Sequence, residues 1–130
     1  MNQSPVDQFL QAVVDAQMAS CQAFAQSADL DATVPNWRFG THGAEAIRTE
    51  LGRWYTDQGY FEEVRRSAIE GGELVEFTLC WVEQGVPHAC HQVHVLGIEA
   101  NKIVSDRAWC GGRWPASLLA EMGEAARAAG

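Results

Sequence analysis

The first part of the chain carries hydrophobic residues at a helical spacing. A repeat of about 3.6 residues predicts a helix from residue 5 to about residue 27. Ser4 is a suitable N-cap for this helix, and Pro5 suits its first position. The apolar positions that carry the repeat are Val6, Phe9, Leu10, Val13, Cys21 and Phe24.

The next segment predicts a short strand and a second helix. SADLD (27–31) resembles a turn, and ATVPNWRF (32–39) resembles a strand. Pro35 interrupts this strand and favours a sheet edge, because proline cannot donate a backbone hydrogen bond. The second helix is expected over 43–57, capped by Thr41 or His42. Its apolar stripe contains Ile47, Leu51, Trp54 and Tyr55.

From Tyr60 onward, apolar and polar residues alternate as they do in strands. Turn signals at EGGE (70–73), EQGVP (83–87) and EANK (99–102) divide this region into a four-stranded antiparallel meander. A final helix is expected from Pro115, carrying Leu118, Leu119 and Met122. The pattern predicts an α+β fold with one domain over residues 1–130 and a helical tail over about 115–130.

The register of the meander decides which side chains share a face. If EANK closes a tight hairpin, Ile98 lies opposite Ile103, and a turn centred on Gly85 places Cys80 opposite Cys90. A bulge would shift either register. The face expected to pack against the helices contains Val75, Phe77, Leu79, Trp81, Ala89, His91, Val93, Val95, Val104, Asp106, Ala108 and Cys110. The face expected toward solvent or a partner subunit contains Glu76, Thr78, Cys80, His88, Cys90, Gln92, His94, Ser105, Arg107 and Trp109.

Asp106 and His91 are the polar residues expected on the apolar face. Desolvation of a carboxylate in an apolar cavity favours its neutral form, which suits general acid/base chemistry. A hydrogen bond to buried backbone is the alternative role for Asp106, and a satisfied core histidine is the alternative for His91. The expected register separates the two by about 13 Å, at about 3.3 Å per residue, so a direct Asp/His pair is not expected.

Three of the four histidines lie in HACHQVHV (88–95). Metal binding by His88, Cys90 and His94 is one interpretation, but zinc needs three or four converging ligands, so we expect no metal site. Glu76, His94 and Arg107 are expected as an ionic ladder across the outer face. With Trp109 beside it, this ladder predicts a homodimer interface more than a catalytic site.

Composition narrows the classes of partner. The net charge of −8 argues against nucleic acid binding, and the sequence contains neither a long apolar run nor a signal-peptide pattern. We therefore expect no nucleic acid partner, no membrane association and a cytoplasmic location. Four irregularly spaced cysteines favour reduced thiols over a disulfide framework.

The order of elements, GAEAI (43–47) and ANKIVSDRAW (100–109) together resemble the nuclear transport factor 2-like superfamily. The resemblance covers about residues 5–112 and is greatest to the SnoaL-like and ketosteroid isomerase-like branch. It implies a cone-shaped, curved, mostly antiparallel sheet wrapped around N-terminal helices. It also implies a pocket for a small apolar molecule such as a steroid, terpenoid or polyketide, frequent dimers, and isomerase, cyclase or hydrolase chemistry without a cofactor.

The chain departs from the catalytic patterns of these relatives. Ala108 occupies the position at which hydrolase-like relatives carry an acid in a motif similar to W-R-D-Y-F, and Thr33 and Pro35 replace polar pocket residues. Two hypotheses remain. In the first, Asp106 is an acid/base and His91 a polar contact, in a pocket lined by Trp37, Phe77, Trp81, Val93 and Val104. In the second, the chain is a non-catalytic ligand-binding or dimerisation module whose cavity its own side chains fill.

Overall fold

The computed structural model describes residues 3–130. Its helices are α1 (Pro5–Asp15), a short 3-10 helix (Met18–Ser20), α2 (Ala44–Trp54) and α3 (Ala116–Ala128). Its strands are β1 (Phe24–Val34), β2 (Trp37–His42), β3 (Gly59–Ile69), β4 (Gly72–Glu83), β5 (Val86–Glu99), β6 (Lys102–Cys110) and β7 (Trp114–Pro115).

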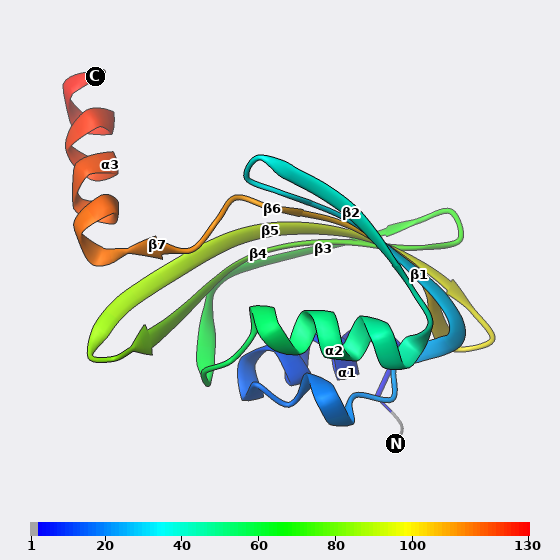
Figure 1. Cartoon of the computed structure of the whole chain (residues 1–130). Helices are drawn as coiled ribbons and strands as arrows, with labels where there is room; N and C mark the ends of the chain where they lie inside the picture. The colour runs from blue at the N-terminus through cyan, green and yellow to red at the C-terminus, as the bar shows by residue number, and fades with distance from the viewer. Residues whose placement is uncertain (1–2) are drawn as a thin grey trace.

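The strands form one curved sheet in the order β2-β1-β6-β5-β4-β3, and β7 pairs with β5. The contact between β1 and β6 is parallel, and the other pairs are antiparallel. The sheet arches over α1 and α2, while α3 projects from one end of the sheet beyond β7 (Figure 1). The expected α+β cone is therefore confirmed.

The core fills the space between the concave face of the sheet and the two N-terminal helices. Its largest fully buried apolar side chains come from both layers: Phe9, Met18, Leu30, Ile47, Leu51, Phe77, Leu96 and Ile103. Burial of this apolar surface is the main free-energy term that holds α1 and α2 against the sheet. It also fixes which face of each strand points inward.

Helix α1 is shorter than the hydrophobic spacing predicts. Ser4 and Asp7 form a capping box at its N-terminus, as the sequence favours, but the helix ends at Asp15. Ala16 takes the left-handed conformation with φ of 54° and directs the chain into the 3-10 helix. Phe24, which fits the helical repeat, instead begins β1. The prediction of one helix to about residue 27 was wrong.

The segment expected as a turn and one short strand forms a hairpin. Residues 27–31 lie inside β1, and β1 and β2 pair from Asp29 with His42 to Val34 with Trp37. Pro35 and Asn36 form the connection, with Asn36 at a φ of 64°. Pro35 thus ends one strand and starts the turn instead of interrupting a single strand.

The four-stranded meander is confirmed, but its central hairpin differs by one residue from the expected register. Gln84 and Gly85 both have positive φ and form a two-residue turn, so Glu83 pairs with Val86. A turn centred on Gly85 alone was wrong. Since side chains alternate along a strand, this single residue reverses both expected faces of β5. Cys90, Gln92 and His94 point to the core, whereas His91 and Val93 point outward.

The hairpin between β5 and β6 closes as expected, and a bulge then shifts its register. Glu99 pairs with Lys102 and Ile98 with Ile103, but Gly97 pairs with Ser105, which leaves Val104 unpaired in the bulge. The one-residue shift at this bulge cancels the effect that the one-residue shift at the β4–β5 turn would have on the faces of β6. Asp106 and Ala108 therefore face the core as the sequence predicts.

Candidate functional site

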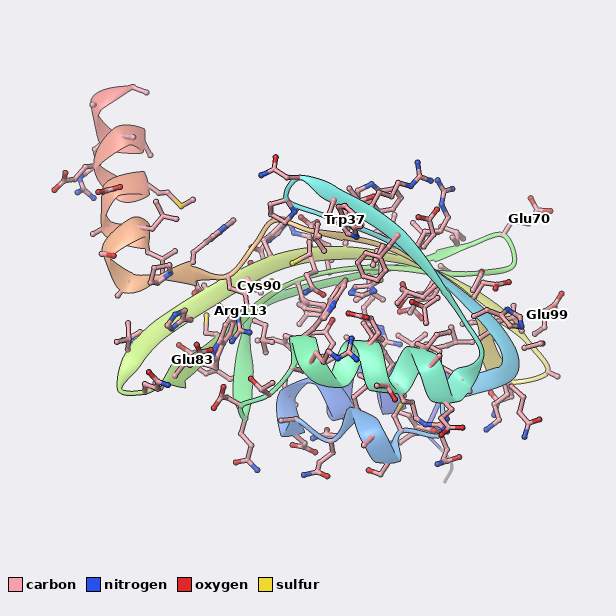
Figure 2. All side chains as sticks on the ribbon, in the orientation of Figure 1. Trp37, Glu70, Glu83, Cys90, Glu99 and Arg113 are labelled. Atoms are coloured by element: carbon pink, nitrogen blue, oxygen red, sulfur yellow. The ribbon has the colours of Figure 1, made fainter. Side chains whose placement is uncertain are left out.

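A cavity of about 240 Å³ opens on the concave side of the sheet, between the end of α2 and the segment that leads to β7. Cys90 and Arg113 mark this region beneath the sheet in Figure 2. Its apolar walls come from Val34, Pro35, Trp54, Leu79 and Trp81, and its polar groups from Tyr55, Cys90, Gln92, Cys110 and Arg113. Apolar walls with a few converging polar groups are typical of small-molecule sites.

A larger hollow of about 1250 Å³ lies along the outside of α2 and the start of β1. Its surface mixes both signs of charge, with Arg48 and Lys102 near Glu45 and Glu50. No convergent polar set or apolar wall distinguishes it from an ordinary solvated surface. The smaller cavity is therefore the candidate site.

A chain of buried polar side chains runs from the cavity wall into the core. The Tyr55 hydroxyl donates to Gln92 Oε1 at 2.6 Å, and His94 Nε2 lies 2.8 Å from the same oxygen. His94 Nδ1 lies 2.8 Å from Asp106 Oδ1. Burial raises the pKa of Tyr55 well above its ordinary value, which keeps the phenol protonated.

Hydrogen-bond roles constrain the protons of this chain. Gln92 Oε1 can only accept, so His94 Nε2 must carry a hydrogen. Two arrangements then satisfy the contact between His94 Nδ1 and Asp106: an imidazolium against a carboxylate, or a neutral imidazole against a carboxylic acid. Within residues 3–130, Asp106 Oδ2 is buried without a hydrogen-bond partner. One buried proton therefore lies between His94 and Asp106 in both arrangements.

Aromatic side chains close the deep end of the cone around His94. Phe77 stacks on the imidazole with 5.5 Å between ring centroids, and Phe9 meets it edge-on at 5.1 Å. His94 has no exposed surface. Side chains of the core therefore fill the cone beyond Gln92, and the cavity occupies the mouth of the cone.

Two thiols lie side by side on the cavity wall. The Sγ atoms of Cys90 and Cys110 are 3.3 Å apart, and Gln92 Nε2 donates to both, at 3.3 and 3.5 Å. The backbone N–H of Gly112 also donates to Cys110 Sγ. The hydrogen bond from Cys90, followed by the Gly112 and Gln92 donors, lowers the pKa of Cys110. The same thiol contact and burial raise the pKa of Cys90.

The structure separates the two residues expected to be catalytic. Asp106 faces inward as expected, but His94 and Gln92 lie between it and the cavity. His91 is on the opposite face, where it contacts Glu76 and Thr78, so its expected inward position was wrong. The reason is the reversed face of β5. The histidine that contacts Asp106 is His94, which was expected on the outer face.

The five side chains expected to line the pocket are dispersed. Trp81 lines the cavity and Phe77 lies in the core beside His94. Trp37 is 67% exposed at the start of β2, on the β1–β2 hairpin (Figure 2). Val93 faces outward, and Val104 lies in the bulge. The last three positions do not reach the cavity.

Sequence reasoning missed Tyr55, Gln92 and His94 as a connected set and the two thiols as a pair. One signal was available, because Cys90, Gln92 and His94 alternate along one strand and must share a face. That face was assigned to the wrong side of the sheet. The hydrogen bond between Gln92 and Tyr55 joins residues 37 positions apart, and strand alternation does not reveal such a contact.

The expected outer ladder of Glu76, His94 and Arg107 is replaced by another. Because His94 points inward, Glu76 instead binds His91 Nε2 at 2.8 Å and faces Arg65. Arg107 lies over the ring of Trp109. Within residues 3–130, no three His, Cys, Asp or Glu side chains are arranged to hold a metal ion. No helix in that range has the length and apolar character needed to cross a membrane.

Comparison with known proteins rests on structure. No family model matches the chain, and no curated protein matches its sequence. A nuclear transport factor 2-like protein from Anabaena variabilis superposes with a TM-score of 0.69 at 14% identity, covering 83% of this chain and 84% of that one. A protein from Bacillus subtilis with a proposed isomerase activity gives 0.67 at 15% identity, covering 82% and 84%.

A third solved structure is a hypothetical protein from Catenulispora acidiphila with a ketosteroid isomerase-like fold, in complex with trimethylamine. It superposes with a TM-score of 0.63 at 15% identity and covers 85% of this chain and 88% of that one. Identities this low establish a shared architecture and leave the activity open. The chain therefore has the nuclear transport factor 2-like, ketosteroid isomerase-like fold.

Proposed function

We propose that this chain is a SnoaL-like protein that binds a small, mostly apolar molecule in the cavity at the mouth of the cone. The observation that carries the proposal is the composition of the cavity wall. Trp54, Leu79 and Trp81 provide apolar surface, and the Gln92 amide and the two thiols converge on one side of it. Such a wall excludes water from an apolar ligand while a few polar groups fix its orientation.

The size of the cavity narrows the ligand class. Its volume of about 240 Å³ lies below the range of roughly 300–1,000 Å³ that is typical of sites for drug-sized ligands. Of the classes that the sequence suggests, a small terpenoid fits this volume better than a four-ring steroid, and a molecule with a single aromatic ring is also small enough. The trimethylamine bound by the structural relative from Catenulispora acidiphila is also a small molecule.

The buried polar chain supports a role in orienting the Gln92 amide. Tyr55 and His94 both hold Gln92 Oε1, which turns the amide nitrogen toward the thiols. An acid/base role for Asp106 stays a prediction, and for a ligand in this cavity it would act through His94 and Gln92. Isomerase, cyclase or hydrolase chemistry likewise stays a prediction.

A ligand panel on a cavity-filled variant tests the proposal. Val34→Phe places a larger side chain at the cavity wall without touching the buried polar chain, and Val64→Phe is a matched control at an exposed position on β3. We expect one class among small terpenoids, aromatic rings, steroids and fatty acids to raise the melting temperature of wild type and Val64→Phe. At ten times Kd the gain is about 1.4 kcal/mol, or several degrees.

The shift should be small or absent in Val34→Phe. An equal shift in Val34→Phe would place the ligand elsewhere. If no class shifts the wild type, the alternative of a binding or dimerisation module with a self-filled cavity gains support, since Phe9 and Phe77 already fill the deep end of the cone.

A further inference from the structure

The ligand binding proposed above uses the two thiols only as polar groups of the cavity wall and leaves their contact with each other unexplained. Cys90 and Cys110 come from neighbouring strands, and their sulfur atoms are 3.3 Å apart. A disulfide bond is about 2.05 Å long, so bond formation needs an approach of roughly 1.2 Å. Both residues line the cavity, which provides a route for a small reactant.

The two sulfur atoms differ in their surroundings. Cys110 is the more exposed of the pair, and its Sγ accepts hydrogen bonds from the Gly112 N–H and the Gln92 amide. Cys90 is 3% exposed and shares the Gln92 amide with Cys110, and either thiol can donate in the contact between the two sulfur atoms. The Gly112 N–H is thus the donor that distinguishes Cys110. Donors aimed at one sulfur favour its thiolate, which is the reactive form. Cys110 is therefore the nucleophile, and Cys90 is placed to react second.

The remaining cysteines provide an internal comparison. The Cys21 thiol donates to the Gln8 carbonyl oxygen at 4.0 Å, and Cys80 donates to Glu62 Oε2 at 3.3 Å. Burial raises the pKa of both thiols. Within residues 3–130, neither one has a second sulfur at hydrogen-bond distance. The described residues thus contain one pair of thiols in mutual contact, and the other two thiols have no such sulfur neighbour.

We propose that Cys110 and Cys90 form a site of reversible oxidation, at which a small hydroperoxide entering the cavity converts the two thiols into a disulfide. The Cys110 thiolate attacks the terminal oxygen of the hydroperoxide, so that an S–O bond forms and the O–O bond breaks. The alkoxide takes up the proton that the Cys110 thiol released and leaves as an alcohol. Cys90 then attacks the sulfenic sulfur, so that an S–S bond forms, the S–O bond breaks and water leaves. Two molecules of a low-molecular-weight thiol return both cysteines to the reduced state and leave joined as their own disulfide.

The test is oxidation of the full chain with stoichiometric hydrogen peroxide, followed by alkylation and peptide mapping. Trypsin cleaves after Arg66, Lys102, Arg107 and Arg113, so a Cys90–Cys110 disulfide joins peptide 67–102 to peptide 108–113. Peptide 67–102 also contains Cys80, and Cys80→Ser makes the assignment unique. We expect the cross-linked pair in wild type, Cys80→Ser and Cys21→Ser, and its loss on treatment with dithiothreitol.

Single variants then resolve the order of the two steps. Cys90→Ala should accumulate a sulfenic acid on Cys110 that dimedone traps, and Cys110→Ala should leave Cys90 unmodified at the same peroxide dose. At pH 7, iodoacetamide should modify Cys110 on the order of tenfold faster than Cys21 or Cys80.

Two results would overturn the proposal. One is oxidation of wild-type Cys110 to the sulfinic acid without a cross-link, and the other is modification of Cys21 or Cys80 as fast as Cys110. Both are read from wild-type protein, so neither depends on the folding of a variant. They are also independent of the ligand panel, because thiol oxidation does not require that the cavity bind an apolar molecule.

Discussion

At the scale of single residues, His94 and Asp106 form a fully buried polar pair in the core. Both side chains have no exposed surface, and their closest polar atoms are 2.8 Å apart. Removal of one partner from such a pair costs much more than the pair contributes over an apolar replacement, because the other partner is left buried and unsatisfied. The side chain at position 106 therefore bears directly on stability.

Two substitutions of Asp106 separate hydrogen bonding from charge. Asp106→Asn offers an amide hydrogen to a neutral His94, so we expect a loss of about 1–2 kcal/mol in the free energy of unfolding. Asp106→Ala leaves His94 Nδ1 without a partner and should cost about 3–5 kcal/mol. Urea denaturation measures both. Equal losses would show that the hydrogen bond to His94 does not determine the stability of this region.

The face to which the sequence assigns each side chain depends on the register of its strand, because side chains alternate between the two faces. Asp106 was placed on the inner face correctly, whereas His91, Val93 and His94 were each placed on the wrong face. All three errors follow from one turn residue, because a loop centred on Gly85 and a two-residue turn at Gln84 and Gly85 both fit EQGVP and differ by one residue in register. An apolar pattern alone could not correct them, because β5 carries polar or thiol side chains on its inner face.

At the scale of elements, α1 is attached to the sheet by charge as well as by apolar packing. The Asp7 backbone N–H donates to Ser4 Oγ, and the Asp7 carboxylate contacts Arg66 of β3 at 2.6 Å. Arg66 also binds Glu73 of β4. The hydrogen bond from Arg66 lowers the pKa of Asp7, with a further contribution from Ser4. The folded state therefore favours the ionised form of the Asp7 carboxyl group.

Asp7→Asn should weaken this attachment in a pH-dependent way. A lowered pKa in the folded state means that the stabilisation is present above the ordinary pKa of 3.8 and is lost as pH falls through the folded value. The expected loss at pH 7 is about 1 kcal/mol or less, because the pair is partly exposed.

Thermal unfolding of wild type and Asp7→Asn at pH 7 and at pH 3 measures this loss of stability, which should be smaller at pH 3. Asp15→Asn is the matched control, because Asp15 lies in the last turn of the same helix, where a negative charge opposes the helix dipole. A loss at pH 7 equal to that of Asp7→Asn would contradict the assignment to Arg66.

The elements themselves were predictable where strong local signals existed. Three turn motifs located the hairpins of the meander, and Ser4 with Pro5 located the start of α1. The end of α1 was not predictable, because Ala16 carries no sequence signal for the left-handed conformation that it adopts. The length of β1 depends on its parallel pairing with β6, a contact between distant parts of the chain.

At the scale of the whole molecule, we propose a homodimer through the outer face of the sheet. This face presents Trp109, which is 41% exposed, next to Arg107, and Glu76 lies beside His91. A net charge of −8 makes two copies repel each other, so association must depend on apolar contact and on locally paired charges.

Light scattering after size exclusion tests the dimer. We expect twice the chain mass of 14.2 kDa for wild type and a single chain for Trp109→Glu. Trp37→Glu adds the same charge at an exposed tryptophan on the β1–β2 hairpin and should leave the dimer intact. A wild-type mass of one chain would refute the interface.

Helix α3 projects from one end of the sheet beyond β7 and contributes no buried residue to the core (Figure 1). Natural selection for a stable fold therefore exerts little pressure on its sequence, while each core position such as Phe9 or Phe77 is tightly constrained. Among descendants of this chain, the segment after β7 can diverge, lengthen or acquire a new binding role at small cost to folding. The cone and its C-terminal helix can thus evolve at different rates within one polypeptide.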